Sequence, residues 1–186
     1  MAQRSSLSQF SSRTSDIPFD ARKIIVFPLW YACKIIFFST SIPWPSELKV
    51  LLLRVFGARV GKSVLIKPRV NVHLPWNLEI DDYSWIGEEV EIYNFEVVKI
   101  GSNVCLSQRA FICAAGHNFR DPAFSYRHFP ISIGDGAWIQ ASVFVCAGVN
   151  VGCEAVIEAG SVLRSNAEFN SVYSGNPAQR TGTRWK

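Results

Sequence analysis

The chain has 186 residues, 48% hydrophobic and 18% charged, which is enough apolar material for one domain with a real core and excludes a disordered chain. The formal net charge is only +4 and no basic stripe carries interleaved aromatic residues, so the sequence argues against nucleic-acid binding. The 5 cysteines form no CxxC pair and are odd in number, which indicates reduced thiols in a cytoplasmic protein.

Residues 1–59 are predicted to form a polar arm followed by an apolar, helical N-terminal cap. Residues 1–20 are polar and rich in serine, without the apolar core of a signal peptide. Residues 24–38 are the most hydrophobic stretch, but a proline and a lysine interrupt them and a membrane span needs about 20 apolar residues. Two interpretations stay open: this segment caps the end of a repeat domain, or residues 22–40 dock peripherally on the inner face of a membrane.

A short helix is predicted next. The IPWP sequence at 42–45 breaks the chain, and Ser46 is a plausible N-cap for the apolar run ELKVLLLRVF. Gly57 fits the end of this helix. The helix would deliver the chain to the first residue of a long repeat.

The repeat occupies residues 60–168, where an aliphatic residue returns every six positions. The positions are Val60, Ile66, Val72, Ile80, Ile86, Ile92, Ile100, Leu106, Ile112, Ile133, Ile139, Val145, Val151, Ile157 and Leu163. A period of six fits neither a helix nor an alternating strand, and it is typical of a parallel β-helix whose coils are triangles of short strands. We therefore predict an all-β domain of about five coils.

The coils are not all alike. Residues 60–79 and 80–99 have twenty residues each, which predicts a two-residue bulge at one corner. The third coil stops after His117 and resumes at Ile133, so residues 118–132 form an inserted loop. Two regular coils follow at 133–150 and 151–168, and residues 169–186 form a C-terminal tail.

Glycine follows the aliphatic residue in five places. These are Gly61, Gly87, Gly101, Gly134 and Gly152. We expect tight corners with positive φ there, because glycine adopts that conformation without strain.

His117 is the best-placed candidate for chemistry, because it lies at the exit into the inserted loop. Long loops on a rigid scaffold are where catalysis and binding tend to occur. A neutral imidazole can accept a proton near pH 7, so His117 is a candidate general base. The alternative is a solvated corner residue without a role.

The hexapeptide coils, the loop AAGHNFRDPAF, the run GDGAWIQASVFVCAGVNVG and the closing SGNPA together resemble the hexapeptide-repeat O-acetyltransferases. The nearest branch is similar to the colanic acid biosynthesis acetyltransferases. The resemblance implies a left-handed β-helix, a homotrimer, and acetyl-CoA as the acyl donor bound between neighbouring subunits. It also implies that His117 deprotonates a sugar hydroxyl, and that the alkoxide attacks the thioester.

The resemblance assigns further residues on each side of the reaction. Candidate acceptor contacts are Asn94, Asn118 and Asp121, although Asn94 could equally be a turn residue. Trp138 corresponds to the aromatic residue of the related GxWIG motif, which lines the CoA cleft. The pantetheine arm would pair with backbone groups of Ala141, Ala159 and Gly160.

The CoA phosphates call for Lys or Arg, and this sequence departs from the family at those positions. Where relatives commonly read SVVTKD the chain reads SVLRSN, and where they read GNPAK it reads GNPAQR. Arg164 and Arg180 are carried over as the candidate phosphate ligands.

Two other functions stay open. A metal enzyme of the carbonic anhydrase type on the same scaffold needs three His ligands at a subunit boundary, and the spacing of His73, His117 and His128 is poor for this. We therefore expect no metal. A β-helix without catalysis, used as a scaffold or interaction module at the membrane surface, is the other. The acceptor could be a polysaccharide, a lipid-linked repeat unit, a free sugar or an antibiotic.

Overall fold

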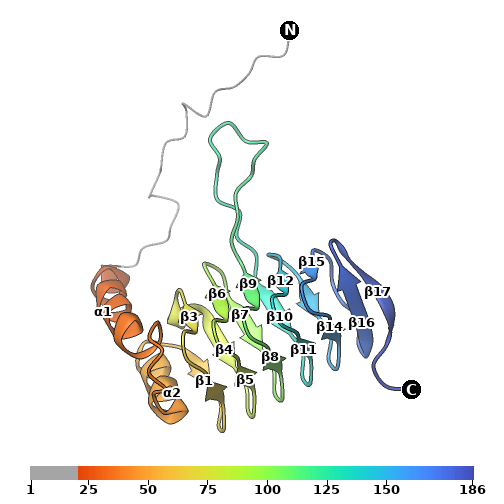
Figure 1. The fold of residues 1–186 in the computed structure, drawn as a ribbon. Helices are drawn as coiled ribbons and strands as arrows, with labels where there is room; N and C mark the ends of the chain where they lie inside the picture. The colour runs from red at the N-terminus through yellow and green to blue at the C-terminus, as the bar shows by residue number, and fades with distance from the viewer. Residues whose placement is uncertain (1–20) are drawn as a thin grey trace.

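The computed structural model describes residues 21–186, with side chains described from Ile25 onward. Two helices precede a stack of short strands, and one long loop projects from the stack (Figure 1). The predicted polar arm at 1–20 lies outside the described residues, as do the side chains of Arg22 and Lys23.

The strands form three sheets, which are the faces of a triangular prism. Sheet A contains β1 (Arg59–Val60), β4 (Leu78–Ile80), β7 (Val98–Ile100), β10 (Ile131–Ile133) and β13 (Asn150–Val151). Sheet B contains β2 (Leu65–Ile66), β5 (Trp85–Ile86), β8 (Cys105–Leu106), β11 (Trp138–Ile139), β14 (Val156–Ile157), β16 (Ser171–Gly175) and β17 (Ala178–Thr183). Sheet C contains β3 (Asn71–Val72), β6 (Glu91–Tyr93), β9 (Phe111–Cys113), β12 (Phe144–Val145) and β15 (Val162–Leu163).

The six-residue period sets the register of these sheets. Each strand from β1 to β15 pairs in parallel with the strand one coil away, so that Ile139 lies between Leu106 and Ile157. All of the predicted aliphatic positions are buried, and none is more than 8% exposed. The prediction of a left-handed parallel β-helix is confirmed.

The two bulged coils are also confirmed. Val60 pairs with Ile80, and Ile80 pairs with Ile100, which gives twenty residues per coil, whereas Ile133 pairs with Val151 eighteen residues later. In the first coil the extra residues form a 3-10 turn at Pro75–Asn77. They lie at the edge between sheets C and A, the same edge from which the long loop departs.

The expectation of positive φ at the five glycines is wrong. Left-handed residues occur instead three positions after the aliphatic residue, and most are not glycine, as at Ser63 and Tyr83. The glycines are needed because the next coil approaches too closely for a side chain. A Cβ atom at Gly134 would lie 2.6 Å from the backbone nitrogen of Cys153. Close approach, rather than backbone conformation, selects glycine at these corners.

Helix α2 (Ser46–Val55) covers the open N-terminal edge of the first coil. The Lys49 side chain is completely buried, and its Nζ donates to the carbonyls of Ile66 at 3.2 Å and Lys67 at 2.9 Å. Arg54 donates likewise to the carbonyl of Val60. Strand groups that would otherwise have no partner are therefore satisfied by the cap.

Ser46 does not act as the predicted N-cap. Pro45 occupies the N-cap position and no side chain there bonds the helix. The Ser46 hydroxyl instead accepts a hydrogen bond from the Ile66 backbone N–H at 3.0 Å. The hydroxyl that local sequence would assign to capping the helix therefore satisfies a backbone group of sheet B.

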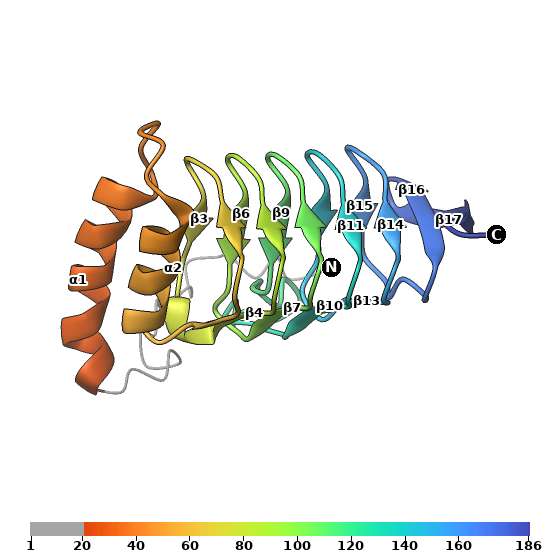
Figure 2. The ribbon, with the colours of Figure 1, turned by 90° about the horizontal axis from the view of Figure 1, so that it is seen from below.

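Helix α1 (Ala21–Phe37) completes the cap at the same end of the stack as α2 (Figure 2). Trp30 is fully buried, and its Nε1 donates to the carbonyl of Val72 at 3.2 Å. Its ring packs 5.2 Å from those of Phe38 and Phe56, measured between centroids. The capping interpretation of this segment therefore holds for one face of α1. Among the described residues, no helix is both long and apolar enough to cross a membrane.

The C-terminal tail is also structured. Strand β16 continues sheet B beyond β14, and β17 folds back antiparallel to it. Gly175 and Pro177 lie at the turn of this hairpin. The hairpin is the other end of the stack, opposite the helical cap (Figure 2).

Candidate functional site

The inserted loop is a narrow hairpin at its base. His117 bridges to Tyr126 in antiparallel fashion, the Arg127 N–H donates to the Gly116 carbonyl at 2.8 Å, and the Asn118 N–H donates to the Ser125 carbonyl at 2.9 Å. Figure 1 shows the loop standing away from the prism. His117 is therefore held at the root of the loop, where the loop meets the rigid stack.

The His117 ring is fixed by three contacts. Its Nδ1 lies 2.9 Å from the Phe124 carbonyl oxygen. A carbonyl only accepts, so Nδ1 carries a proton, and in the neutral imidazole the lone pair is then on Nε2. The ring also stacks on Phe124 at 4.3 Å between centroids and lies 4.7 Å from the Tyr126 ring. This arrangement presents Nε2 as a proton acceptor, which a general base requires.

The candidates Asn118 and Asp121 shape the loop. The Asn118 side-chain oxygen accepts from the Arg120 N–H at 3.2 Å, and that of Asp121 accepts from the Ala123 N–H at 2.9 Å. Hydrogen bonds from the Ser125 side chain and then the Ala123 backbone lower the pKa of Asp121. Both side chains thus support the segment that carries the Phe124 carbonyl.

Asn94 has no exposed surface in the single chain. It is 0% exposed, and its side-chain amide forms two hydrogen bonds with the Leu74 backbone, at 2.9 Å and 2.6 Å. The Asn77 side chain in turn donates to the Asn94 carbonyl. Asn94 therefore holds the bulges of the first two coils together, which leaves it no direct route to an acceptor here.

Trp138 and the backbone candidates gather at a different place, on sheet B and its edge toward sheet C. Trp138 is 40% exposed, and its Nε1 donates to the Ser107 hydroxyl at 2.9 Å. One coil further on, the Gly160 N–H donates to the Ala141 carbonyl at 2.9 Å. The Trp138 indole is thus a fixed wall beside an exposed edge of the stack.

Gln140 is a member of this group that the sequence reasoning missed. It stands where the related GxWIG motif has its last glycine, and its Oε1 accepts from the Ala159 N–H at 3.2 Å. The backbone donor expected to meet pantetheine is therefore occupied by a side chain of the protein. The departure from the motif was the signal that could have found it.

The two candidate phosphate ligands are not brought together. Arg164 follows β15 at the edge between sheets C and A. Arg180 lies in β17 and forms a 3.1 Å ion pair with Glu168. Nor does a single chain bring His117 to Trp138, because they lie at different edges of the prism.

The outward rows of the three sheets differ in chemistry. Sheet A presents polar side chains: Arg59, Glu79, Lys99, Ser132 and Asn150. Sheet B presents a mainly apolar row: Leu65, Trp85, Cys105, Trp138 and Val156. Sheet C is polar in its first coils and apolar afterwards: Asn71, Glu91, Phe111, Phe144 and Val162. Leu65, Trp85 and Trp138 are the well-exposed members, at 44%, 46% and 40%, whereas Val156 is buried. Exposed apolar side chains gathered on one face mark an interaction surface.

His73 and His128 do not form a metal site with His117. The His73 ring packs 4.6 Å from Phe95 and 4.9 Å from Tyr93, while burial and then the charge of Lys34 lower its pKa to about 4. Within the described residues, no group of three or more His, Cys, Asp or Glu side chains could hold a metal ion.

The comparisons with known proteins place this chain in a family. No family model matches the sequence. The chain is 35% identical over 150 residues to the candidate colanic acid biosynthesis acetyltransferase WcaF of Escherichia coli K12, across 81% of this chain and 82% of that protein. It is 29% identical over 146 residues to the galactoside O-acetyltransferase of the same organism, across 76% of this chain and 71% of that protein.

Solved structures agree on the fold. The hexapeptide-repeat acetyltransferase VCA0836 of Vibrio cholerae superposes with a TM-score of 0.81 at 20% identity, over 90% of this chain and 95% of that chain. A galactoside acetyltransferase in complex with coenzyme A gives 0.79 at 24% identity, over 95% and 86%. VCA0836 has also been solved with acetyl-CoA.

The fold and the sequence relatives thus define a hexapeptide-repeat acetyltransferase. The chain belongs to the acetyltransferase family that includes WcaF, and this prediction is confirmed.

Proposed function

We propose that the protein transfers an acetyl group from acetyl-CoA to a sugar hydroxyl in the biosynthesis of a cell-surface polysaccharide. The observation that carries this is the fixed tautomer of His117, which presents an unprotonated Nε2 at the root of the only long loop among residues 21–186. The acceptor class follows the names of the relatives, one for colanic acid biosynthesis and one for galactosides.

In this proposal His117 transfers the proton, and the Phe124 carbonyl stabilises its protonated ring. Nε2 takes the proton of the acceptor hydroxyl as its oxygen attacks the thioester carbonyl, which forms the C–O bond. The resulting imidazolium is stabilised by the Phe124 carbonyl at Nδ1, 2.9 Å away. Collapse of the tetrahedral intermediate breaks the C–S bond, and the imidazolium returns its proton to the leaving thiolate. Charge balances at each stage without a covalent enzyme intermediate.

The active unit in this proposal is a homotrimer. His117 and Trp138 lie at different edges of one prism, so a second subunit must complete the site. Trp138 of sheet B and the apolar residues Phe111, Phe144 and Val162 of sheet C support this, because they could cover one another on neighbouring copies while sheet A stays in water. Acetyl-CoA then lies along Trp138, Ala141, Ala159 and Gly160, with its phosphates toward the hairpin end and Arg180.

Helix α1 supports a peripheral membrane contact on the cytoplasmic side. Its outer face exposes Ile25 (70%), Leu29 (59%) and Ile36 (55%), and Pro28 and Tyr31 lie beside them. An exposed apolar helix face with an aromatic residue suits the interface of a bilayer. All five cysteines are unpaired, which fits a reducing compartment. Pelleting with anionic liposomes tests the contact, and Leu29→Glu with Ile36→Glu should abolish it.

The function is tested by incubating the protein with labelled acetyl-CoA and a panel of mono- and oligosaccharides, with mass spectrometry of the products. We expect O-acetylated sugar, and we expect His117→Ala to lose about 10²–10⁴-fold in rate. Full transfer by His117→Ala would show the mechanism to be wrong. No transfer to any saccharide would favour the scaffold interpretation, and loss of activity with a chelator would favour the metal enzyme.

A further inference from the structure

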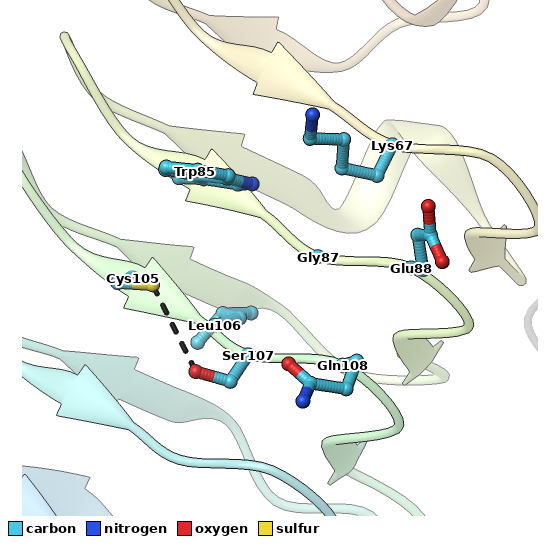
Figure 3. A pocket seen from close by; sticks show the side chains of 8 residues that line it. All are labelled: Lys67, Trp85, Gly87, Glu88, Cys105, Leu106, Ser107 and Gln108. Atoms are coloured by element: carbon cyan, nitrogen blue, oxygen red, sulfur yellow. Dashed lines mark hydrogen bonds between the residues drawn. The ribbon is translucent and has the colours of Figure 1, made fainter. Parts of the chain in front are cut away.

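A second concave site lies on the first three coils, at the edge between sheets B and C. It is a pocket of about 450 Å³, and none of its residues was among the predicted site residues. Trp85 and Lys67 form one side, and Ser107 with Gln108 forms the other (Figure 3). The pocket is open to solvent in the single chain.

The shape of the pocket comes from one small residue between two large ones. Trp85 and Trp138 stand in the same outward row of sheet B, and Cys105 pairs in register with both. At the corner that follows Trp85, Gly87 adds no side chain to the lining, and a Cβ atom there would lie 2.8 Å from the backbone nitrogen of Gln108 in the next coil. The floor therefore stays low between two exposed indoles.

The lining combines the apolar plane of an indole with hydrogen-bond donors and acceptors. Trp85 is 46% exposed, and the Lys67 ammonium lies 5.3 Å from the centroid of its ring. Glu88 and Gln108 project from the same edge (Figure 3). Within residues 25–186 neither Lys67 nor Glu88 forms an ion pair, so both keep hydrogen-bonding capacity for a ligand.

This combination fits a pyranose ring. A sugar ring has a C–H face that packs on an indole, and hydroxyls around its rim that both donate and accept hydrogen bonds. Lys67 can only donate, the Glu88 carboxylate can only accept, and the Gln108 amide can do both. A purely apolar ligand would use the indole but none of these three polar groups.

The position of the pocket relates it to the acetyl donor. From the C-terminal end, sheet B and its edge carry Arg180, then Ala159 with Gly160, then Trp138. The next residue in this direction is Ser107, which accepts the Trp138 Nε1–H at 2.9 Å and also lines the pocket. A donor whose phosphates lie at the hairpin end would therefore direct its thioester toward this pocket.

We propose that the pocket is a saccharide subsite, in which a pyranose ring of the acceptor stacks on Trp85 and hydrogen-bonds with Lys67 and Glu88. The inference rests on the proposed function for the identity of the acceptor. It adds where that acceptor is held and which face of the subunit holds it. The base would then come from His117 of a neighbouring subunit.

Binding is measured by saturation-transfer NMR with the full-length protein and a panel of methyl pyranosides and disaccharides. Wild type should bind at least one of them, and Trp85→Ala should weaken that binding about tenfold or more. Lys67→Met should weaken it by less. The matched control is Tyr83→Ala, because Tyr83 is 55% exposed and has Lys62 5.6 Å from its ring on the same coils, but lies outside the pocket.

The outcomes separate the two proposals. Saccharide binding that needs Trp85 but not Tyr83 supports the subsite, even if no acetyl transfer is detected. Equal binding by wild type and Trp85→Ala, or no binding by wild type, overturns it, whatever the transferase assay gives. If Trp85→Ala dissociates the oligomer and Tyr83→Ala does not, Trp85 is an interface residue and the subsite is also overturned.

Discussion

The outer faces of sheets A and B differ, although the strands behind them are built alike. On sheet A, Glu79 forms ion pairs with Arg59 and, at 3.7 Å, with Lys99. Sheet B carries exposed indoles at Trp85 and Trp138 in the same row. The aliphatic interior is common to both, so the interior specifies the prism. The outward rows decide which face meets water and which meets a subunit or a substrate.

The largest expected effect tests whether a site is shared between subunits. His117→Ala removes the base, and Ala159→Trp should block the donor groove with an indole at an exposed corner. Each variant alone should be nearly inactive. When the two are co-expressed, random mixing should restore about a quarter of wild-type activity, because one interface in four then has both intact residues.

The measurement is the transfer rate of purified mixed oligomers carrying two different tags. Separately purified and then mixed homo-oligomers are the control for simple addition of residual activities. If mixed oligomers are no more active than that control, the base and the donor groove belong to one chain. The difference between the faces of sheets A and B would then have no role in forming the active site.

A second prediction contrasts sheets within one coil. Phe144 lies on sheet C, 5.0 Å from the Phe111 ring, and Ser132 lies on sheet A. Phe144→Asp should dissociate the oligomer at micromolar concentration, because it places a charge in an apolar contact. Ser132→Asp should leave the mass unchanged. Size-exclusion chromatography with light scattering measures the oligomer mass of both variants. Equal masses would contradict the assignment of sheet C to the subunit interface and sheet A to solvent.

A third prediction concerns the scaffold that all faces share. Gly134→Ala should lower the free energy of unfolding by about 1–3 kcal/mol, since the new Cβ would overlap the next coil. Gly182→Ala is the control, because nothing lies within 4 Å of a Cβ atom there. Chemical denaturation measures the unfolding free energy of both variants. Equal midpoints would contradict the prediction, because they would mean that neighbouring coils can move apart to accept the new Cβ atom.

The smallest expected effect is on the pH dependence of stability and comes from His73, near the cap. Burial and then the charge of Lys34 hold its pKa at about 4, whereas its ordinary value is 6.5. The unfolded chain therefore gains this proton first, so stability is lost as pH falls from 6.5 to about 4. His73→Phe should remove that part of the pH dependence. Melting temperatures across this range test it, and parallel curves for the two proteins would refute it.

The sequence predicted the interior of the stack and the place of its interruption, because a six-residue period counts one buried residue per strand. It could not predict contacts between coils. The role of Gly134 depends on Cys153 in the next coil, and the Asn94 side chain is hydrogen-bonded to the backbone of Leu74, twenty residues away. His117 was predicted at the loop exit, but its tautomer depends on the Phe124 carbonyl, which the folded loop alone brings to it.

The two ends of the stack prevent the β-helix from growing by the addition of further coils. A β-helix with bare ends could add another coil, or another molecule, indefinitely. Here Lys49 and Arg54 occupy the carbonyls at one end, and β17 runs antiparallel at the other, where a parallel strand would be needed to continue the stack. Growth into fibres is therefore blocked at both ends by different means. Association is left to the sides of the prism, where it can close into a ring of fixed size.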